Sequence, residues 1–133
     1  MSRHILAVAA VVLLVVGCAA PNPFPDGYET TLDRSIQIGE GNGDTLDVLF
    51  TAHNWRFQGD AGQTVRILVR SDGVSDPRFT LYDADLGVIA ADDDGGEGLN
   101  AEATVTLPTS GEYILRVDMN APGRYSLRID DEE

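Results

Sequence analysis

From about residue 31 onward, apolar and polar positions alternate in short stretches that are separated by Gly, Asp, Pro and Asn. This period of two is typical of strands with one buried face and one face in water. The alternation is clearest at Trp55–Phe57, Val65–Val69, Ala103–Leu107, Tyr113–Val117 and Tyr125–Ile129. After the N-terminal segment, no stretch has the period of an amphipathic helix. The pattern therefore predicts an all-β domain.

Other segments are expected to complete the sheets. Ile36 and Ile38 alternate with polar neighbours and predict a strand that a loop over 39–44 follows. Leu46–Phe50 is apolar and predicts a short strand or a bulged entry to the next one. Further strands are expected at Phe79–Leu81 and Val88–Ala91. About eight strands at regular spacing predict an antiparallel β-sandwich, because two sheets packed face to face bury one side of every alternating strand.

The aromatic residues follow the same parity rule. Five of them are expected to face the core: Trp55, Phe57, Phe79, Tyr113 and Tyr125. By parity Tyr82 points outward from the domain, while Phe24 and Tyr28 belong to the segment before it. A glycan-binding face needs several exposed aromatic rings, so the sequence offers little support for one.

The first 18 residues have the order of a lipoprotein signal peptide. A short basic opening, Met1–His4, precedes the apolar run Ile5–Val16, and Gly17 comes directly before Cys18, the only cysteine. We therefore expect residues 1–17 to be removed and Cys18 to be lipidated. The alternatives are an N-terminal anchor helix, for which the run is short of the roughly 20 residues needed, and a plain signal peptide cleaved near Ala19-Ala20.

The remaining chain is long enough for one domain. We expect residues 18–30 to be the lipidated cysteine and a flexible, Pro-rich tether. The β-sandwich is expected over 31–130, followed by an acidic tail, 131–133, that frays together with Asp130. Since Cys18 has no cysteine partner, packing and hydrogen bonding must stabilise the domain.

The charge is strongly negative. The chain has 22 Asp and Glu against nine basic residues, all of them Arg, for a net charge of −13. Such a body is repelled by nucleic acid and by anionic membrane surfaces, so we expect no nucleic-acid partner. It attracts divalent cations, or it serves as a solvated coat.

A series of turn-plus-strand motifs covers roughly residues 45–130. The motifs are Trp55-Arg56-Phe57, Gly59, Ala61–Val65, Asp76-Pro77, Phe79–Asp83, Ile89-Ala90, Asp92–Gly96 with Asn100, Leu107-Pro108, Gly111–Tyr113 and Gly123–Leu127. In order and spacing they resemble the bacterial pre-peptidase C-terminal domain. That resemblance implies a jelly-roll-like β-sandwich that is not catalytic and accompanies exported enzymes.

The resemblance has two departures. His53 stands where the family commonly has an acidic residue, and Leu86 separates Asp85 from Gly87. The N-terminal segment resembles that of bacterial lipoproteins, which implies a multiply acylated Cys18 and firm anchoring. Alanine at position 19 implies sorting to the outer membrane if the cell has two membranes.

The sequence offers little raw material for catalysis. His53 is the only histidine after the signal peptide, and no serine lies in a nucleophile-elbow pattern. A zinc site needs about four ligands, which His53 and a lipidated Cys18 cannot supply. We therefore expect a protein that is not an enzyme. The alternative is a minimal hydrolase using His53 or paired Asp residues.

Calcium is the one metal that the residues suggest, since a hard cation takes six to eight oxygen ligands from a flexible loop. The candidate ligands are Asp83 and Asp85 in one turn, and Asp92, Asp93, Asp94 and Asn100, with Glu97 nearby, on the Gly-rich loop Asp92–Asn100. The alternative is a solvated turn whose Asp and Gly serve the backbone.

Together these patterns predict an exported, lipid-anchored, non-catalytic β-sandwich that acts as a binding or accessory module at the cell envelope. Its expected partners are the membrane, through the lipid on Cys18, and either an envelope polymer or an exported enzyme. No cofactor is required, and a calcium-binding structural domain is the alternative function.

Overall fold

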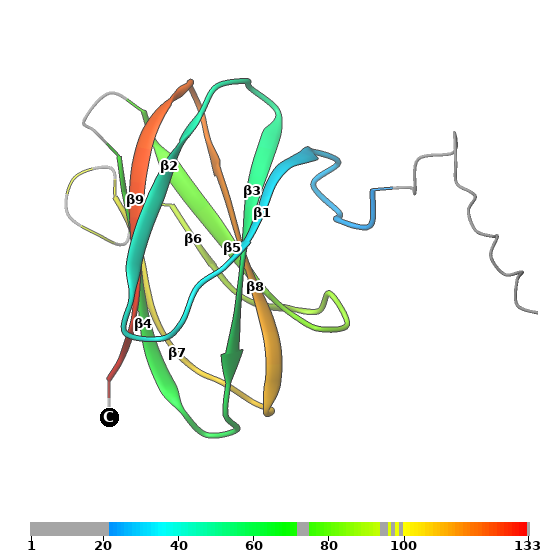
Figure 1. Ribbon diagram of the computed structural model, residues 1–133, viewed down its shortest axis with the longest axis vertical. Coiled ribbons are helices and arrows are strands. Elements are labelled where there is room, and N and C mark those ends of the chain that lie inside the picture. The colour runs from blue at the N-terminus through cyan, green and yellow to red at the C-terminus, as the bar shows by residue number, and fades with distance from the viewer. Residues whose placement is uncertain (1–21, 72–74, 94–95, 97, 99, 133) are drawn as a thin grey trace, which may run out of the picture.

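The computed structural model describes residues 22–71, 75–93, 96, 98 and 100–132. Within these residues the chain forms nine strands in two sheets that pack face to face (Figure 1). The strands are β1 (Glu29–Ser35), β2 (Gly41–Leu46), β3 (Thr51–Gly59), β4 (Thr64–Ser71), β5 (Pro77–Asp83), β6 (Val88–Asp92), β7 (Ala101–Thr106), β8 (Gly111–Met119) and β9 (Gly123–Asp131). The predicted all-β sandwich is confirmed.

Nearly every connection crosses from one sheet to the other. The five-stranded sheet has the order β1-β3-β8-β5-β6, and the four-stranded sheet has the order β2-β9-β4-β7. β5 and β6 are the one consecutive pair among the described strands that shares a sheet. The ladders are antiparallel except between β1 and β3. That pair runs parallel because β2, in the opposite sheet, carries the chain back between them.

The inward positions of both sheets form one apolar core. All five aromatic residues that the sequence places inside are at most 5% exposed, which confirms the parity argument. The core consists of Ile36, Leu46, Trp55, Phe57, Val65, Ile67, Val69, Phe79, Leu81, Ala101, Leu107, Tyr113, Leu115, Val117, Met119, Tyr125, Leu127 and Ile129. Burial of this apolar area is the main favourable contribution to folding.

The prediction of a loop over 39–44 was wrong. Residues Gly41–Leu46 form β2, which pairs with β9 along its full length. The alternation of apolar side chains cannot detect this strand, because its inward positions Asn42 and Asp44 are polar. Main-chain pairing with β9 holds it instead. The strand predicted at Ile36 and Ile38 is not formed, and both residues lie in the turn between β1 and β2. The Ile36 side chain packs into the core and is 3% exposed.

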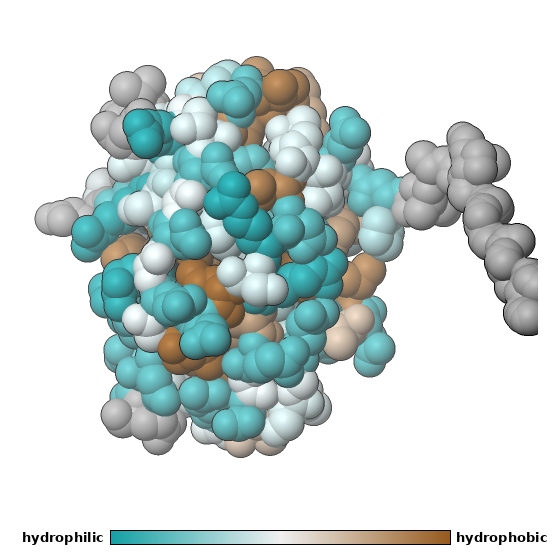
Figure 2. Space-filling view, in the orientation of Figure 1, coloured by the Kyte–Doolittle hydropathy of each residue, from teal (hydrophilic) through white to brown (hydrophobic). Residues whose placement is uncertain are grey.

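Two further expectations need correction. Of the apolar segment 46–50, only Leu46 belongs to a strand, and Val48, Leu49 and Phe50 are exposed in the turn before β3. Brown surface lies over this turn at the top of Figure 2. The acidic tail does not fray at Asp130, because β9 continues through Asp131 and the Glu132 N–H donates to the Thr64 carbonyl at 2.9 Å.

Among the described residues, no helix has the length and apolar character required to cross a membrane.

Gly43 provides a test of the β2–β9 pairing. A Cβ at this position would lie 2.4 Å from the carbonyl oxygen of Tyr125 and 3.1 Å from the Cα of Ser126. Both are backbone atoms of β9, so β2 would have to shift. We expect Gly43→Ala to lower the free energy of unfolding by about 1–3 kcal/mol, the usual cost of overpacking, in urea melts.

The control is Ser126→Ala, which changes the exposed residue paired with Gly43 on β9. We expect it to stay within about 0.5 kcal/mol of wild type. An unchanged midpoint for Gly43→Ala would contradict the close approach of β2 and β9.

Candidate functional site

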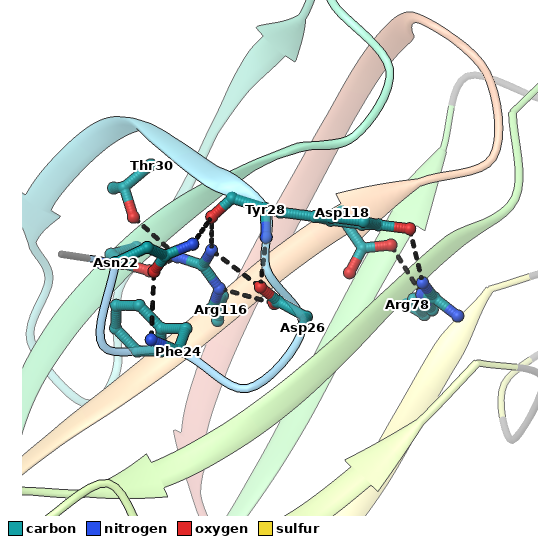
Figure 3. Close-up of polar contacts among 9 residues, drawn as sticks. Asn22, Phe24, Asp26, Tyr28, Thr30, Arg78, Arg116 and Asp118 are labelled. Atoms are coloured by element: carbon teal, nitrogen blue, oxygen red, sulfur yellow. Dashed lines mark hydrogen bonds and ion pairs between the residues drawn. The ribbon is translucent and has the colours of Figure 1, made fainter.

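Residues 22–28, which we call the arm, fold onto the outer face of the five-stranded sheet (Figure 3). Phe24–Gly27 form a tight turn in which the Gly27 N–H donates to the Phe24 carbonyl at 3.2 Å. Proline at the second position and glycine at the fourth suit such a turn, and Gly27 has a φ of 76°. The Asn22 amide then donates to the Tyr28 carbonyl at 2.7 Å, which closes the arm into a compact loop.

Arg116 of β8 holds the arm in place. Its side chain is 1% exposed and donates to both carboxylate oxygens of Asp26, at 2.7 and 3.1 Å. It also donates to the Thr30 hydroxyl at 2.7 Å, to the Asn54 side-chain oxygen at 3.0 Å and to the Tyr28 carbonyl. A buried charge is tolerated only when it is paired and hydrogen-bonded. The arm therefore supplies hydrogen-bond acceptors, and a negative charge, that Arg116 would lack on the sheet alone.

Phe24 contributes the apolar part of the same contact. Its ring meets Tyr82 edge-on at 5.3 Å between centroids and packs with Ile114, while the Arg116 guanidinium lies 3.9 Å from its centroid. Tyr82 does point outward from the sandwich, but it is only 2% exposed because Phe24 covers it. The expectation of an exposed Tyr82 was therefore wrong, as was the expectation of a fluid segment at Phe24.

A second ion pair continues the contact toward the end of the sheet. Arg78 of β5 donates to Asp118 at 2.6 Å and to the Tyr28 hydroxyl at 3.3 Å. The Tyr28 ring in turn meets the Phe50 ring at 5.8 Å between centroids. The arm thus touches β5, β8 and the turn before β3.

Two carboxyl groups at this contact, Asp26 of the arm and Asp118 of β8, have shifted pKa values. Partial burial by itself would raise the pKa of Asp26, but hydrogen bonds from Arg116 and the Tyr28 N–H outweigh it and lower the pKa below 3.8. For Asp118, burial dominates over the hydrogen bond from Arg78, and its pKa is raised. Asp26 therefore favours the folded state when charged, whereas Asp118 opposes it.

The outer face of the four-stranded sheet has a different character, and we call it the arginine face. Its outward side chains follow from the strand register: Gly41, Gly43 and Thr45 on β2; Arg124, Ser126, Arg128 and Asp130 on β9; Thr64, Arg66, Leu68 and Arg70 on β4; Glu102, Thr104 and Thr106 on β7. Four of the nine arginines in a chain of net charge −13 thus share one face.

A shallow groove of about 750 Å³ runs over this face between β2 and β4. Two of its arginines are already paired: Arg66 with Glu102, and Arg128 with Asp130 at 3.0 Å. Among the residues that the structure describes, Arg70 and Arg124 have no carboxylate partner and are exposed. Arg70 lines this groove, and both Arg70 and Arg124 line an adjoining hollow of about 470 Å³ together with Asp44. The two hollows therefore present guanidinium groups that are available to a ligand.

The candidate calcium ligands lie in two separate places. Asp83 and Asp85 are at the tip of the β5–β6 hairpin, whereas Asp92 pairs with Phe79 at its other end. Four residues of strand separate the two groups, which is about 13 Å. The described residues contain no cluster of three or more acidic, His or Cys side chains that could hold a metal ion.

Several of these oxygens already serve the backbone. Asp83 accepts from the N–H groups of Asp85 and Gly87, at 2.9 and 2.8 Å. Asp92 accepts from the Glu102 N–H at 2.9 Å, and Asn100 accepts from the Ser71 N–H at 3.3 Å. This is the use expected of a solvated turn. Asp93 follows the last residue of β6 and is exposed.

Three residues named in the sequence analysis, Asp94, Glu97 and Cys18, lie outside the described residues. Calcium binding and the lipidation of Cys18 both stay predictions.

His53 is a core residue at 4% exposure. Its Nδ1 lies 2.6 Å from the Tyr125 hydroxyl, whose oxygen also accepts from the Trp55 indole N–H at 2.9 Å. Burial lowers the pKa of His53, which favours the neutral imidazole. The Tyr125 hydroxyl therefore joins His53 and Trp55 in one buried hydrogen-bonded cluster between the sheets.

The contributions of Arg116 and Phe24 were missed from the sequence. The signal was present in Phe24-Pro25-Asp26-Gly27, which has the composition of a turn with an aromatic residue at its start. Arg70 and Arg124 could have been found by extending the parity rule to polar positions, since both alternate with core residues.

The fold is shared with several solved structures. The chain is similar to the pre-peptidase C-terminal domain of a collagenase from Bacillus anthracis, with a TM-score of 0.61 and 19% identity over 73% of this chain and 93% of that one. It is also similar to PliG, a periplasmic inhibitor of g-type lysozyme, from Aeromonas hydrophila, with a TM-score of 0.51 and 15% identity over 73% and 98%.

PliG from Salmonella Typhimurium gives a TM-score of 0.50 and 20% identity over 73% and 97%. No family model matches the sequence, and no curated protein matches it. At these identities the similarity shows the fold alone. The class of protein defined here is a small β-sandwich of the kind found in the pre-peptidase C-terminal domain and in periplasmic lysozyme inhibitors.

Asp26 provides a test of the arm contact. Its pKa is lower in the folded than in the unfolded chain, so its charge stabilises the fold above about pH 4 and this contribution is lost at lower pH. We expect Asp26→Asn to lower the free energy of unfolding by about 3 kcal/mol at pH 7, because it leaves the buried Arg116 without its anion. The difference in free energy of unfolding between Asp26→Asn and wild type should become smaller below about pH 4, as measured in denaturant melts.

The matched control is Asp33→Asn. Asp33 pairs with Arg56 at 2.7 Å in an exposed position, where loss of an ion pair costs at most about 1 kcal/mol. If Asp26→Asn lowers the free energy of unfolding at pH 7 by no more than Asp33→Asn does, the role assigned to Arg116 is contradicted.

Proposed function

We propose that this protein is an exported, lipid-anchored, non-catalytic module that presents the arginine face of its β-sandwich to a partner in the cell envelope. The observation that carries the proposal is the difference between the two outer faces. The arm covers the part of the outer face of the five-stranded sheet around Tyr82 and Ile114, while the opposite face has no such cover among the described residues and collects four arginines.

The arm lies on the side from which an anchor would attach. In Figure 1 it is to the right of β1 and β3, whereas β2, β9 and β4 form the layer on the left. Four peptide units separate Asn22 from Cys18, so covalent geometry keeps Cys18 within about 14 Å of Asn22. A lipid on Cys18 would hold the covered face near the membrane and leave the arginine face directed toward the envelope.

A role without catalysis is supported by His53, whose ring is buried between the sheets and hydrogen-bonded to the Tyr125 hydroxyl. It is also supported by the fold, which is shared with an appended domain of a collagenase and with lysozyme inhibitors. Export is supported by the inhibitors, which are periplasmic.

Anchoring is tested by metabolic labelling with a fatty-acid probe. We expect the wild-type protein to carry the label and to fractionate with membranes, and Cys18→Ser to lose the label, because the thiol is the acylation site. A control, Ser2→Ala, alters the basic opening without touching Cys18 and should be labelled normally. Equal labelling of wild type and Cys18→Ser would contradict lipidation at this residue.

An exported enzyme is the second partner class, and the inhibitor structures favour testing it. Purified full-length protein would be added to a g-type lysozyme acting on cell walls. Slower lysis at stoichiometric amounts would support an enzyme partner, while unchanged lysis would remove this enzyme from the partner class.

A further inference from the structure

We propose that the arginine face binds an anionic glycopolymer, one that carries carboxylate or phosphate groups, and that Arg70 and Arg124 make the principal contacts. The inference rests on the proposed function, because it names the ligand class of the face that the protein presents.

The register places the two arginines next to each other. Ser126 of β9 pairs with Arg70 of β4, and Arg124 lies two residues before Ser126 on the same strand face. Diagonal neighbours in a sheet lie about 7–8 Å apart. Two exposed guanidinium groups at this spacing repel each other, and an anion between or along them relieves the repulsion.

The neighbouring strand leaves room for a ligand. Gly43 is paired with Ser126, and Gly41 is paired with Arg128, so the edge strand has no outward side chain at either position. A Cβ on Gly41 would lie 3.0 Å from Nη1 of Arg128, which shows that this arginine already extends over β2. Ser126 lies in both hollows of this face. Arginines line the first together with Asp130, and Arg70 and Arg124 line the second together with Asp44, whose carboxylate is paired with Arg34.

The chemistry of the face favours a polyanion over a protein surface. Protein interfaces depend on aromatic and apolar anchors in buried pockets. Among the described outward positions the one large apolar side chain is Leu68, and it is 8% exposed. Guanidinium groups, by contrast, match the planar, two-oxygen geometry of carboxylate and phosphate. A shallow groove that follows the strands also suits an extended chain.

The rest of the surface would help to define the binding mode. The net charge is −13, so a polyanion is repelled by most of the molecule. On the arginine face, four arginines stand against Glu102 and Asp130, while Asp44 beside Arg124 is already paired with Arg34. Attraction is therefore confined to this side. Binding should therefore occur in one orientation, with the arm and the anchor on the far side.

The test uses the full-length protein in a neutral detergent and measures binding by calorimetry. The probes are polygalacturonate, poly(glycerol phosphate) and uncharged dextran. We expect wild type to bind at least one of the two polyanions, to bind it more weakly as NaCl is added, and not to bind dextran. Arg70→Gln/Arg124→Gln should weaken this binding by about tenfold or more, from the loss of two exposed ion contacts.

The single variants Arg124→Gln and Arg56→Gln form a matched pair, because they have the same net charge. Arg56 lies on the opposite outer face, paired with Asp33 and Glu112. We expect Arg124→Gln to weaken binding and Arg56→Gln to change it by less than about twofold. Unchanged melting points will show that each variant folds.

Binding of polygalacturonate alone would identify carboxylate as the ligand group, and binding of poly(glycerol phosphate) alone would identify phosphate. Failure of wild type to bind either polyanion at low salt would overturn the inference, as would equal losses in Arg124→Gln and Arg56→Gln or equal binding of dextran. The assay does not depend on the lipid, so it fails separately from the labelling test of Cys18.

Discussion

The buried guanidinium of Arg116 sets the constraint on which the two faces of the sandwich depend. A charge at 1% exposure must find partners for its N–H groups within the protein. The β-sheet offers Asn54, and the remaining partners described here come from the arm and the start of β1. The apolar side chains Ile114 and Tyr82 on the same face need a cover as well, which Phe24 provides. The arm of the same chain therefore covers this part of the face.

Because the arm covers part of one outer face, the two outer faces of the sandwich differ, which the two sheets alone would not bring about. One outer face is joined to the segment that leads to Cys18, and the other is open, small-residue and arginine-rich. The same fold occurs in an appended domain of a collagenase and in periplasmic inhibitors of lysozyme. Since a fold does not determine function, the proposed role is argued from the two outer faces of the sandwich and not from the fold.

Side-chain alternation predicted most of the fold. It located the strands that supply Trp55, Val65–Val69 and Tyr113–Val117, because most of their inward residues are apolar, with His53 of β3 as an exception. It missed β2, whose pairing depends on backbone hydrogen bonds and on glycine at close approach.

The candidate site was less predictable. The arm has the composition of a linker, and its fold depends on Arg116, which is 90 residues away from Asp26 in sequence. The calcium hypothesis relied on acidic residues that are close in the sequence, yet Asp83 and Asp92 lie at opposite ends of a hairpin. Composition could not distinguish a carboxylate free for a cation from one that accepts backbone N–H groups.

Hydrogen exchange of the arm tests the central claim most directly. In the full-length protein, the amides of Phe24, Gly27 and Tyr28 should be protected, because each donates within the folded arm. Arg116→Met should accelerate their exchange by about a hundredfold while the amides of β4 and β9 stay protected. Exchange of the wild-type arm at the rate of an unfolded peptide, or equal protection in Arg116→Met, would contradict the account.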